Sequence, residues 1–437
     1  MKLTITLLVT FCCFWLVITC GNLAAGNDRT NQNARSKEST VTQSQPIATI
    51  TVATGQTDRF NTPVFADVTD LKLSDTCIFV LEERTKEGIK NMDCQLEQSP
   101  YGDRLWWTLD GETKAGKKRT FLLSMSDSKK TTPLTTAVDQ GGALVFFKDN
   151  RHVLQYNYAT TYPPPGVDSV YRRSGYIHPV WSPTGMVLTN IQPPDHYHHY
   201  GIWNPWTKTK FEGNTIDFWD LPQRLGTVRF ENFSSVVNGI VFAEAKIIHH
   251  HVVFPDSEKE KNALREVCDI RVYNTGQDDV FIWDFTSTLN CASSSPVTFE
   301  EYRYAGFGFR ATDQWVRDNC LMLTSEGNTR KDADGSRARW AFVTGKTQED
   351  HCGILFLGYP ANYNFPEPIR IWDENANNGR GDFFFNFAPT KNKDWHILPG
   401  NEYRLKYRIV VYHGDMTTEK SERYWNDFAY PPKVTVQ

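Results

Sequence analysis

The sequence has no excess of charge of one sign and none of the motifs that mark common nucleotide-dependent or zinc-dependent enzymes. The formal net charge of the 437 residues is −4 and charged residues are 22% of the chain, so nothing predicts a nucleic-acid-binding surface. A G-x-S-x-G nucleophile elbow, an H-E-x-x-H helix and a dinucleotide-binding fingerprint are all absent. A paired-carboxylate glycosidase stays open, because its two acids need not be close in sequence.

Cysteine is spaced too widely to predict a structural zinc site. Three of the nine cysteines lie in the first 20 residues, and no C-x-x-C pair occurs among the other six: Cys77, Cys94, Cys268, Cys291, Cys320 and Cys352. Export would permit disulfides, and Cys77 with Cys94 is the closest pair. The sequence alone defines no pairing.

Long apolar runs are lacking beyond the start of the chain. Leu3 to Ile18 is apolar but too short to span a bilayer comfortably, and residues 1–20 resemble a bacterial lipoprotein signal peptide in which Cys20 is lipidated. A plain cleavage near Leu23-Ala24-Ala25 is the alternative. Residues 21–46 are polar and predict a disordered tether. We therefore expect a protein of the periplasm or outer-membrane surface, with membrane contact only through an N-terminal lipid anchor.

No long stretch shows the 3.6-residue periodicity of a helix, whereas alternation typical of strands is frequent. In the segment 402–411, one face carries Tyr403, Leu405, Tyr407, Ile409 and Val411, and the other carries Arg404, Lys406 and Arg408. Hairpins are expected at 144–156 and at 180–188, and buried strands at 280–289, 341–344 and 354–357. The pattern predicts an all-β protein, an antiparallel β-sandwich. Residues 47–140 would form a small β subdomain or the N-terminal part of the sandwich, and residues 141–437 the main domain.

The densest group of chemically active side chains is Asp195-His196-Tyr197-His198-His199-Tyr200-Gly201, in a chain with 11 histidines. On an extended segment, His196 and His198 point to one side and His199 to the other, so one pair can converge on a ligand. Imidazole acts as an acid or base near neutral pH and is a common metal ligand. Because both uses are open, the sequence does not identify a cofactor. A divalent metal would take His196 and His198 with His178, Asp195 or His199, whereas acid/base histidines can cluster without a metal.

Two further segments carry candidate site residues. Tyr171-Arg172-Arg173-Ser174-Gly175-Tyr176 places arginine beside tyrosine, and the planar fork of arginine recognises carboxylates and sulfates. A strand with its charges in solvent is the simpler interpretation. In the segment 301–310, Arg303 with Tyr302 or Tyr304 could face a cleft, whereas glycine alternating with phenylalanine predicts a tightly packed strand.

Several of these motifs together resemble one bacterial family, the so-called methane oxygenase or "PmoA-like" family. They are Tyr-Ile-His-Pro (176–179), Pro-x-Asp-His-x-His-His-x-Gly (193–201), Asp-Phe-Trp (217–219), Gly-Phe-Gly-Phe-Arg (306–310) and Arg-Ile-Val-Val (408–411). The resemblance covers roughly residues 140 to 415. Tyr197 and Tyr200 stand where members usually carry Pro and Arg, and Arg303-Tyr304 where they carry Lys-Glu. The resemblance implies an exported supersandwich, similar to mutarotases and lyases, from glycan-degrading bacteria.

The leading hypothesis from the sequence is an exported carbohydrate-active enzyme, a lyase or dehydratase that acts by β-elimination on oligosaccharides containing uronic acid. Elimination needs a cation to neutralise the carboxylate, a base for the α-proton and an acid for the departing oxygen. We assign neutralisation to Arg173 or Arg303. The acid and base roles fall to residues of the histidine segment and its neighbouring tyrosines: His196, His198, Tyr176 and Tyr200.

Two other hypotheses stay open at this point. A metal-dependent sugar oxidoreductase would use His196, His198 and either His178 or Asp195 as ligands. A non-catalytic glycan-binding lipoprotein would stack sugars on exposed tryptophans, for which the candidates are Trp106, Trp107, Trp203 and Trp206. The expected partner is an acidic oligosaccharide substrate, and no nucleic acid is expected.

Overall fold

The computed structural model describes residues 45–437 apart from residue 75, residues 127–131 and residues 348–349. The predicted signal peptide (1–20) and almost all of the predicted tether (21–46) lie outside the described residues. The described part belongs to one unit, and no helix within it is long and apolar enough to cross a membrane.

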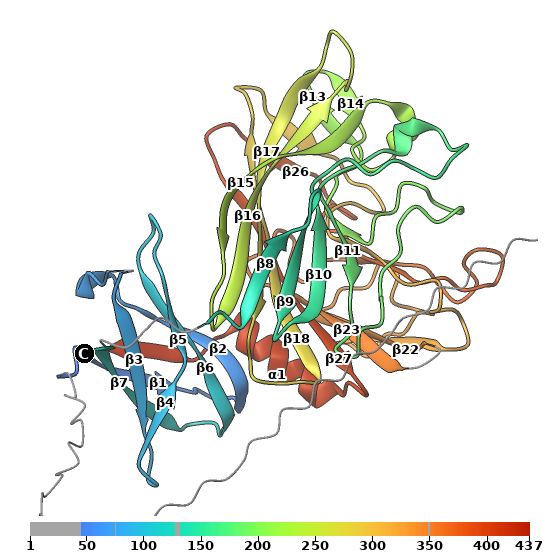
Figure 1. The fold of residues 1–437 in the computed structure, drawn as a ribbon. Helices are drawn as coiled ribbons and strands as arrows, with labels where there is room; N and C mark the ends of the chain where they lie inside the picture. Colours follow the sequence, from blue (N-terminus) through green and yellow to red (C-terminus); the bar gives the residue numbers. More distant parts are fainter. Residues whose placement is uncertain (1–44, 75, 127–131, 348–349) are drawn as a thin grey trace, which may run out of the picture. The chain divides into compact units, whose positions relative to one another are not determined.

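The main body contains two eight-stranded antiparallel sheets, which confirms the all-β prediction (Figure 1). The first sheet has the order β24-β25-β20-β12-β11-β10-β9-β8. Its strands are β8 (Thr135–Asp139), β9 (Ala143–Lys148), β10 (Arg151–Asn157), β11 (Tyr176–Val180), β12 (Ile202–Trp203), β20 (Gly308–Arg310), β24 (Ile369–Ile371) and β25 (Phe384–Phe387). The predicted hairpin at 144–156 is β9–β10. The one predicted at 180–188 is reduced to an isolated bridge between Trp181 and Val187.

The second sheet has longer strands, in the order β15-β16-β17-β18-β27-β23-β22-β21. They are β15 (Gly226–Val237), β16 (Phe242–Val253), β17 (Lys261–Tyr273), β18 (Val280–Cys291), β21 (Cys320–Thr324), β22 (Trp340–Lys346), β23 (His351–Gly358) and β27 (Tyr403–His413). The three buried strands expected from the sequence are parts of β18, β22 and β23.

The largest apolar core draws side chains from both sheets, as expected of a sandwich in which each sheet buries one face. Phe146, Ile177 and Phe309 come from the first sheet, and Ile270 and Phe356 from the second. Burial of this shared surface is the main force that holds the two sheets together.

The polar face of β27 is not simply a solvated face. Arg408 is buried, and its Nε donates to Asp284 Oδ1 at 2.6 Å while its Nη2 donates to Oδ2 at 3.0 Å. Further elements cover this face. The alternation along β27 therefore predicts the strand and the face that packs in the core, but it does not predict that Arg408 is buried.

Helix α1 (Thr418–Ala429) is one of these elements and was not expected from the sequence. The Thr417 hydroxyl caps it by accepting a hydrogen bond from the Lys420 amide at 3.2 Å. Trp425 and Phe428 pack in an apolar cluster with side chains on the outer face of the second sheet. The helix spans only 12 residues and its first half is polar, so the apolar periodicity is too short to detect.

The N-terminal region forms a small β-sandwich of two sheets, β28-β1-β7-β3-β4 and β2-β6-β5 (Figure 1). Its strands are β1 (Ala48–Ala53), β2 (Arg59–Asp67), β3 (Ile78–Arg84), β4 (Ile89–Met92), β5 (Cys94–Glu97), β6 (Arg104–Thr113), β7 (Lys118–Ser126) and the C-terminal β28 (Lys433–Val436). Thus β28 returns to the N-terminal sandwich, and β8 joins the main body although it precedes the expected boundary at 140/141. Cys77 and Cys94 are free thiols, as are the other four described cysteines.

The remaining elements of the described chain are a third sheet of the main body and three 3-10 turns, of which η1 belongs to the N-terminal sandwich. A four-stranded sheet contains β13 (Thr209–Phe211), β14 (Asn214–Ile216), β19 (Val297–Phe299) and β26 (Trp395–Ile397), and the 3-10 turns are η1 (Thr69–Leu71), η2 (Ser169–Tyr171) and η3 (Leu221–Gln223). The histidine segment is part of the long connection between β11 and β12. At its end Gly201 has a φ of +59°, and a Cβ there would lie 2.3 Å from the Ile177 carbonyl oxygen. Only glycine allows this close approach, which fixes the segment against β11.

Candidate active site

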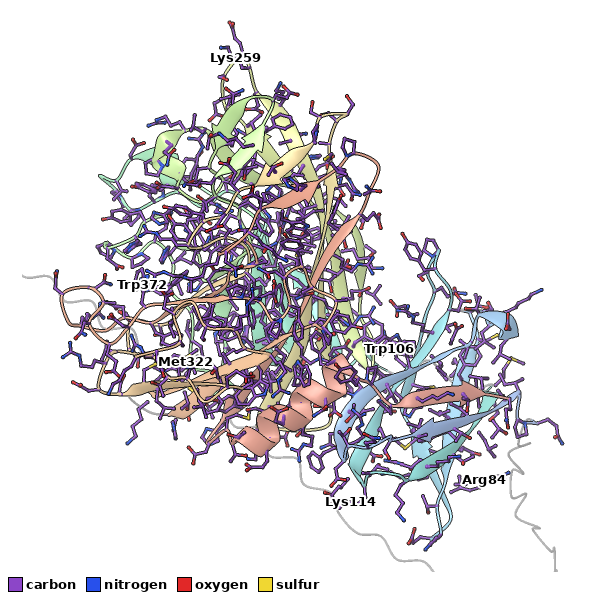
Figure 2. The ribbon with its side chains drawn as sticks, turned by 180° about the vertical axis from the view of Figure 1, so that it is seen from behind. Arg84, Trp106, Lys114, Lys259, Met322 and Trp372 are labelled. Atoms are coloured by element: carbon purple, nitrogen blue, oxygen red, sulfur yellow. The ribbon has the colours of Figure 1, made fainter. Side chains whose placement is uncertain are left out.

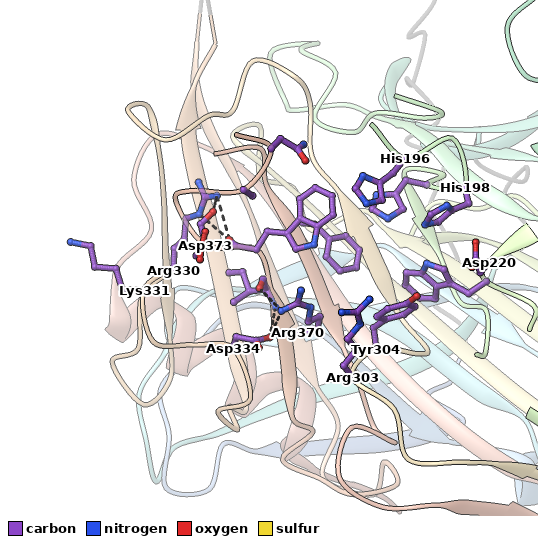
Figure 3. Close-up of a pocket in the computed structure, with 17 residues that line it drawn as sticks. His196, His198, Asp220, Arg303, Tyr304, Arg330, Lys331, Asp334, Arg370 and Asp373 are labelled. Carbon is purple, nitrogen blue, oxygen red and sulfur yellow. Dashed lines mark hydrogen bonds and ion pairs between the residues drawn. The ribbon is translucent and has the colours of Figure 1, made fainter. Parts of the chain in front are cut away.

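A cavity of about 650 Å³ opens at the side of the first sheet that carries the histidine segment. Its lining comes from six separate stretches of the sequence: His196, His198, His199, Trp219, Asp220, Arg303, Tyr304, Arg330, Lys331, Asp334, Arg370, Ile371, Trp372, Asp373, Ala376, Asn377 and Phe384. Figure 3 shows the two histidines on one side, Arg370 and Asp334 on the other, and Arg303 with Tyr304 between them.

The histidine segment folds into consecutive tight turns and is not extended as expected. The His196 amide donates to the Pro193 carbonyl at 2.9 Å, and the His199 amide donates to the His196 carbonyl at 3.0 Å. Even so, His196 and His198 line the same cavity. His199 is only 3% exposed, and its ring stacks between those of His196 and Phe384, with centroids 4.8 and 5.0 Å away.

The His196 ring is oriented by a charge network that runs from partly exposed Asp195 to buried Arg310. Its Nδ1 lies 2.8 Å from Asp195 Oδ2, while Arg310 Nη2 donates to Asp195 Oδ1 at 3.1 Å and Asn377 Nδ2 donates to Oδ2 at 3.0 Å. Burial raises the pKa of Asp195, but the hydrogen bond with His196 and the charge of Arg310 lower it more, so the net shift is well below its ordinary value. An ionised carboxylate only accepts, so the proton of neutral His196 is on Nδ1 and Nε2 keeps its lone pair.

His198 presents a second neutral imidazole to the cavity. Burial, aided by the neighbouring His196, lowers the pKa of His198 to about 4. Neither of its ring nitrogens has a hydrogen-bond partner among the described residues, and its ring centroid is 5.4 Å from that of His196. At neutral pH this side chain is therefore an uncharged hydrogen-bond acceptor.

Two exposed cations of the cavity, Arg303 and Lys331, have no ion pair among the described residues, and Arg303 is the one that lies between the histidines and Arg370 (Figure 3). Its guanidinium lies 5.7 Å from the Tyr302 ring centroid and 5.4 Å from that of Tyr304, and no carboxylate of the described chain pairs with it. Arg370, in contrast, pairs with Asp334 at 3.1 Å, as the dashed lines in Figure 3 show. Arg303 is thus available to an anionic ligand.

Aromatic side chains form part of the cavity wall. Trp372 is partly exposed. Its ring centroid lies 4.7 Å from that of His196 and 4.8 Å from the Arg310 guanidinium carbon. The ring centroids of Trp219 and Tyr304 lie 5.1 Å apart. Burial raises the pKa of the Tyr304 hydroxyl well above its usual value, so this phenol is protonated at neutral pH and can donate.

Three residues predicted to act at this site do not line the cavity. The Tyr200 hydroxyl donates to the Tyr171 carbonyl and the Tyr176 hydroxyl donates to Thr161 Oγ1 at 2.6 Å, and both side chains are buried. Arg173 is buried as well, and its Nη1 donates to the Phe218 carbonyl at 3.1 Å. The structure therefore separates these residues from His196 and His198.

The residues named as metal ligands do not fit a common metal site. His178 is outside the cavity lining, with its Nδ1 2.8 Å from Thr189 Oγ1, and burial lowers its pKa to about 4. Asp195 is engaged by His196 and Arg310. Within the described residues, no group of three or more His, Cys, Asp or Glu side chains is arranged to hold a metal ion.

The tryptophans proposed to stack sugars are all buried, which corrects that interpretation. Trp107, Trp203 and Trp206 are at most 1% exposed. Trp106 lies at the junction of the small sandwich and the main body (Figure 2), where its ring packs against Phe242. Trp106 is 7% exposed and lines another pocket, where the Arg271 guanidinium lies 4.8 Å from its ring centroid.

Sequence reasoning missed much of the cavity: Trp219, Asp220, Trp372 and Asn377, as well as the role of Arg310 in holding Asp195. The clearest signal was the segment 373–381, which contains three asparagines and two glycines between two short strands. Such composition is typical of a shaped loop, and functional residues often lie on loops of a rigid scaffold.

These features define an all-β protein with an open cleft that combines paired imidazoles, a free arginine and an aromatic wall. Residues 143–426 match the family of unknown function DUF6807, and the chain belongs to this family. That description neither supports nor contradicts the "PmoA-like" resemblance, which stays a prediction. No curated protein matches the chain.

Solved structures are similar to this chain only at a distant level. Heparan sulfate lyase HepC from Pedobacter heparinus is 8% identical with a TM-score of 0.32, over 66% of this chain and 38% of that one. A galactose mutarotase related enzyme from Lactobacillus acidophilus is 9% identical with a TM-score of 0.30, over 64% of this chain and 97% of that one. The chain thus spans well under half of the lyase, and similarity at this level carries no argument about activity.

Proposed function

We propose that this protein is a carbohydrate-active enzyme that eliminates an oxygen substituent from a uronic acid unit of an oligosaccharide. The observation that carries the proposal is the pairing, across one open cleft, of an imidazole oriented by Asp195 with an arginine that has no carboxylate partner among the described residues. A cavity of about 650 Å³ is within the size range of small-molecule sites and accommodates a short oligosaccharide. Export and a lipid anchor, predicted from residues outside the described part, belong to the same proposal.

Each cavity residue has a role that matches its chemistry. Arg303 pairs with the uronate carboxylate, which makes the proton on the adjacent carbon more acidic. His196 Nε2 removes that proton, and the imidazolium that forms is stabilised by ionised Asp195. The electron pair of the broken C5–H bond forms the C4=C5 double bond, and the C4–O bond breaks with its electrons going to oxygen. The Tyr304 hydroxyl donates a proton to this departing oxygen, which leaves as an alcohol or as water.

His198 and Trp372 complete the substrate site in this proposal. His198 is a neutral acceptor with both ring nitrogens free of other described side chains, so it binds a sugar hydroxyl. Trp372 offers a partly exposed aromatic face, and sugar rings bury apolar C–H groups against such faces. This assignment replaces the roles expected for Tyr176 and Tyr200, whose hydroxyls are bonded elsewhere.

The proposal is tested by incubating the protein with a panel of oligosaccharides that contain uronic acid and following ultraviolet absorbance and product mass. A C4=C5 bond conjugated to the carboxylate gives new absorbance, and loss of one water distinguishes a dehydratase from a lyase that cleaves the chain. Arg303→Gln should lower kcat by about 10²-fold or more, because the anionic intermediate loses its partner. Arg370→Gln is the matched control, since Arg370 already pairs with Asp334. Turnover of neutral sugars at the same rate, or full activity of Arg303→Gln, would contradict the proposal.

A further inference from the structure

The segment Tyr171 to Tyr176, singled out in the sequence, lines a second pocket that the proposed reaction does not use. The pocket has a volume of about 250 Å³ and shares no lining residue with the active-site cleft. Its walls come from η2, from the residues around η3, from the start of β15 and from the turn after β16: Thr160, Val170, Arg172, Arg173, Ser174, Leu221, Arg224, Gly226, Thr227, Val228, Arg229, Pro255 and Asp256.

Arg173 is the most informative residue of this second pocket. It is 2% exposed, and the Phe218 carbonyl is the one hydrogen-bond acceptor that its guanidinium has in the described chain. Its Nε is buried without a partner, and no described carboxylate lies within ion-pair distance. A buried charge without a direct counter-charge is costly, so an anion that pairs with Arg173 would offset part of that cost.

Glu266 is the nearest candidate for an internal counter-charge, but it is already engaged. Its carboxylate contacts His251 Nε2 at 3.1 Å and accepts from the Ser287 hydroxyl and from Asn204 Nδ2. Glu266 attracts Arg173 only at longer range, and burial outweighs this attraction, so the pKa of Arg173 is lowered to about 10. Arg173 therefore stays positive at neutral pH and lacks a close anion.

Three more guanidinium groups surround the pocket. Arg172 and Arg229 both pair with Asp256, which is 58% exposed. Outside the pocket lining, Arg229 also pairs with Glu260 at 2.7 Å, and Arg224 pairs with an aspartate that is 53% exposed. Exposed ion pairs of this kind contribute little free energy, so they can rearrange around a ligand. The lining thus contains four guanidinium groups and one carboxylate.

Ser174 adds a hydroxyl donor to the four guanidinium groups of the pocket. The Ser174 Oγ accepts a hydrogen bond from the Phe230 amide at 3.1 Å, which leaves its own proton free to donate. Arginine forks and hydroxyl donors around a concave surface match the oxygens of a carboxylate, sulfate or phosphate group.

We propose that the second pocket binds an oxyanion group, with Arg173 at its base and Arg224 and Arg229 at its mouth. The group is carried by a distal unit of an acidic oligosaccharide or belongs to a small free anion. The segment around η3 connects this pocket to the cleft: Trp219 and Asp220 line the cleft, whereas Leu221 and Arg224 line the pocket. An anion in the pocket therefore fixes a segment that contributes to the wall of the active site.

The test is a calorimetric titration of the full chain with inorganic phosphate and with sulfate, at constant ionic strength set by chloride. We expect saturable binding that Arg224→Gln/Arg229→Gln weakens at least tenfold, since both sites are exposed and the substitutions should not affect folding. Arg303→Gln, in the cleft, is the control and should leave this binding unchanged. Arg173→Lys, which keeps the charge but not the fork, should weaken binding if it folds.

A second titration, with a uronic acid tetrasaccharide, distinguishes the two sources of the anion. Binding of phosphate or sulfate that depends on Arg224 and Arg229 identifies a small-anion site. Tetrasaccharide binding with the same dependence, without binding of the free ions, identifies a distal subsite. No saturable binding of any of the three, or binding lost in Arg303→Gln but not in Arg224→Gln/Arg229→Gln, would overturn the inference. The readout is binding and not turnover, so it holds or fails independently of the elimination reaction.

Discussion

Replacement of Asp195 by asparagine probes the orientation of the proposed base. Asp195 Oδ2 accepts from His196 Nδ1 at 2.8 Å, and a hydrogen bond to a charged group contributes about 1.5–3 kcal/mol. If that energy stabilises the imidazolium in the transition state, its loss lowers kcat by about 10- to 150-fold, at about 1.4 kcal/mol for each factor of ten. Asparagine can also donate to Nδ1, which would place the proton of His196 on Nε2. The loss can therefore approach the 10⁴-fold limit of acid/base catalysis, or about 5.5 kcal/mol.

The assay for Asp195→Asn is the initial rate of ultraviolet absorbance at saturating substrate, with thermal unfolding recorded on the same sample. Unfolding matters because, among the described residues, Arg310 would retain only Asp382 as an ionic partner, at 3.8 Å. Asp334→Asn is the matched control: it removes another carboxylate of the cleft, one that pairs with Arg370, and should keep most of its rate. A folded Asp195→Asn protein with the wild-type kcat would refute the reasoning.

Two further predictions concern stability. The pKa of His198 is about 4 in the folded chain against an ordinary 6.5, so below pH 6.5 the unfolded chain binds a proton that the folded chain does not. The free energy of unfolding should therefore fall as the pH drops from 6.5 to 4. In urea unfolding, His198→Gln should lose less of this free energy than the wild type between about pH 7 and about pH 5. An equal loss in both proteins would contradict the burial of His198. Asp284→Asn should destabilise the protein by about 3–5 kcal/mol, because it leaves the buried Arg408 with a weaker partner. Asp58→Asn, which removes an exposed ion pair with Lys114, should have a much smaller effect on the free energy of unfolding. Equal effects of the two substitutions would contradict the argument that burial makes the Asp284–Arg408 pair important.

The sequence predicts the sandwich because its strands are long and strongly patterned. Alternation along β27 follows from one face packing on the core, and β18, β22 and β23 are apolar because both of their faces are covered. Helix α1 escapes detection because its apolar contacts are confined to its second half. The return of β28 to the N-terminal sandwich depends on pairing with β1, and distant pairing of this kind has no local signal.

The candidate site, like the fold, is only partly predictable from the sequence. Composition alone identifies the histidine segment, since three imidazoles within four positions are rare. The cavity also needs Arg303 from the residues before β20, and Arg370 and Trp372 from β24 and the residue that follows it; these segments meet because β20 and β24 both pair with β25. Tyr176 and Tyr200 have suitable chemistry, but the register of β11 and the turns after Gln192 direct their hydroxyls inward. Residue type and proximity in sequence therefore cannot separate a catalytic tyrosine from a structural one.

The central claim is that His196 and His198 act together on a uronic acid unit in the cleft. It is tested most directly by comparing the wild type with His196→Ala/His198→Ala in a single-turnover experiment on an acidic oligosaccharide that the wild type converts. The account predicts an unsaturated product from the wild type, and from the folded double variant a rate lower by about 10²-fold or more. Wild-type activity of the double variant, or an oxidised product without a double bond, would contradict it.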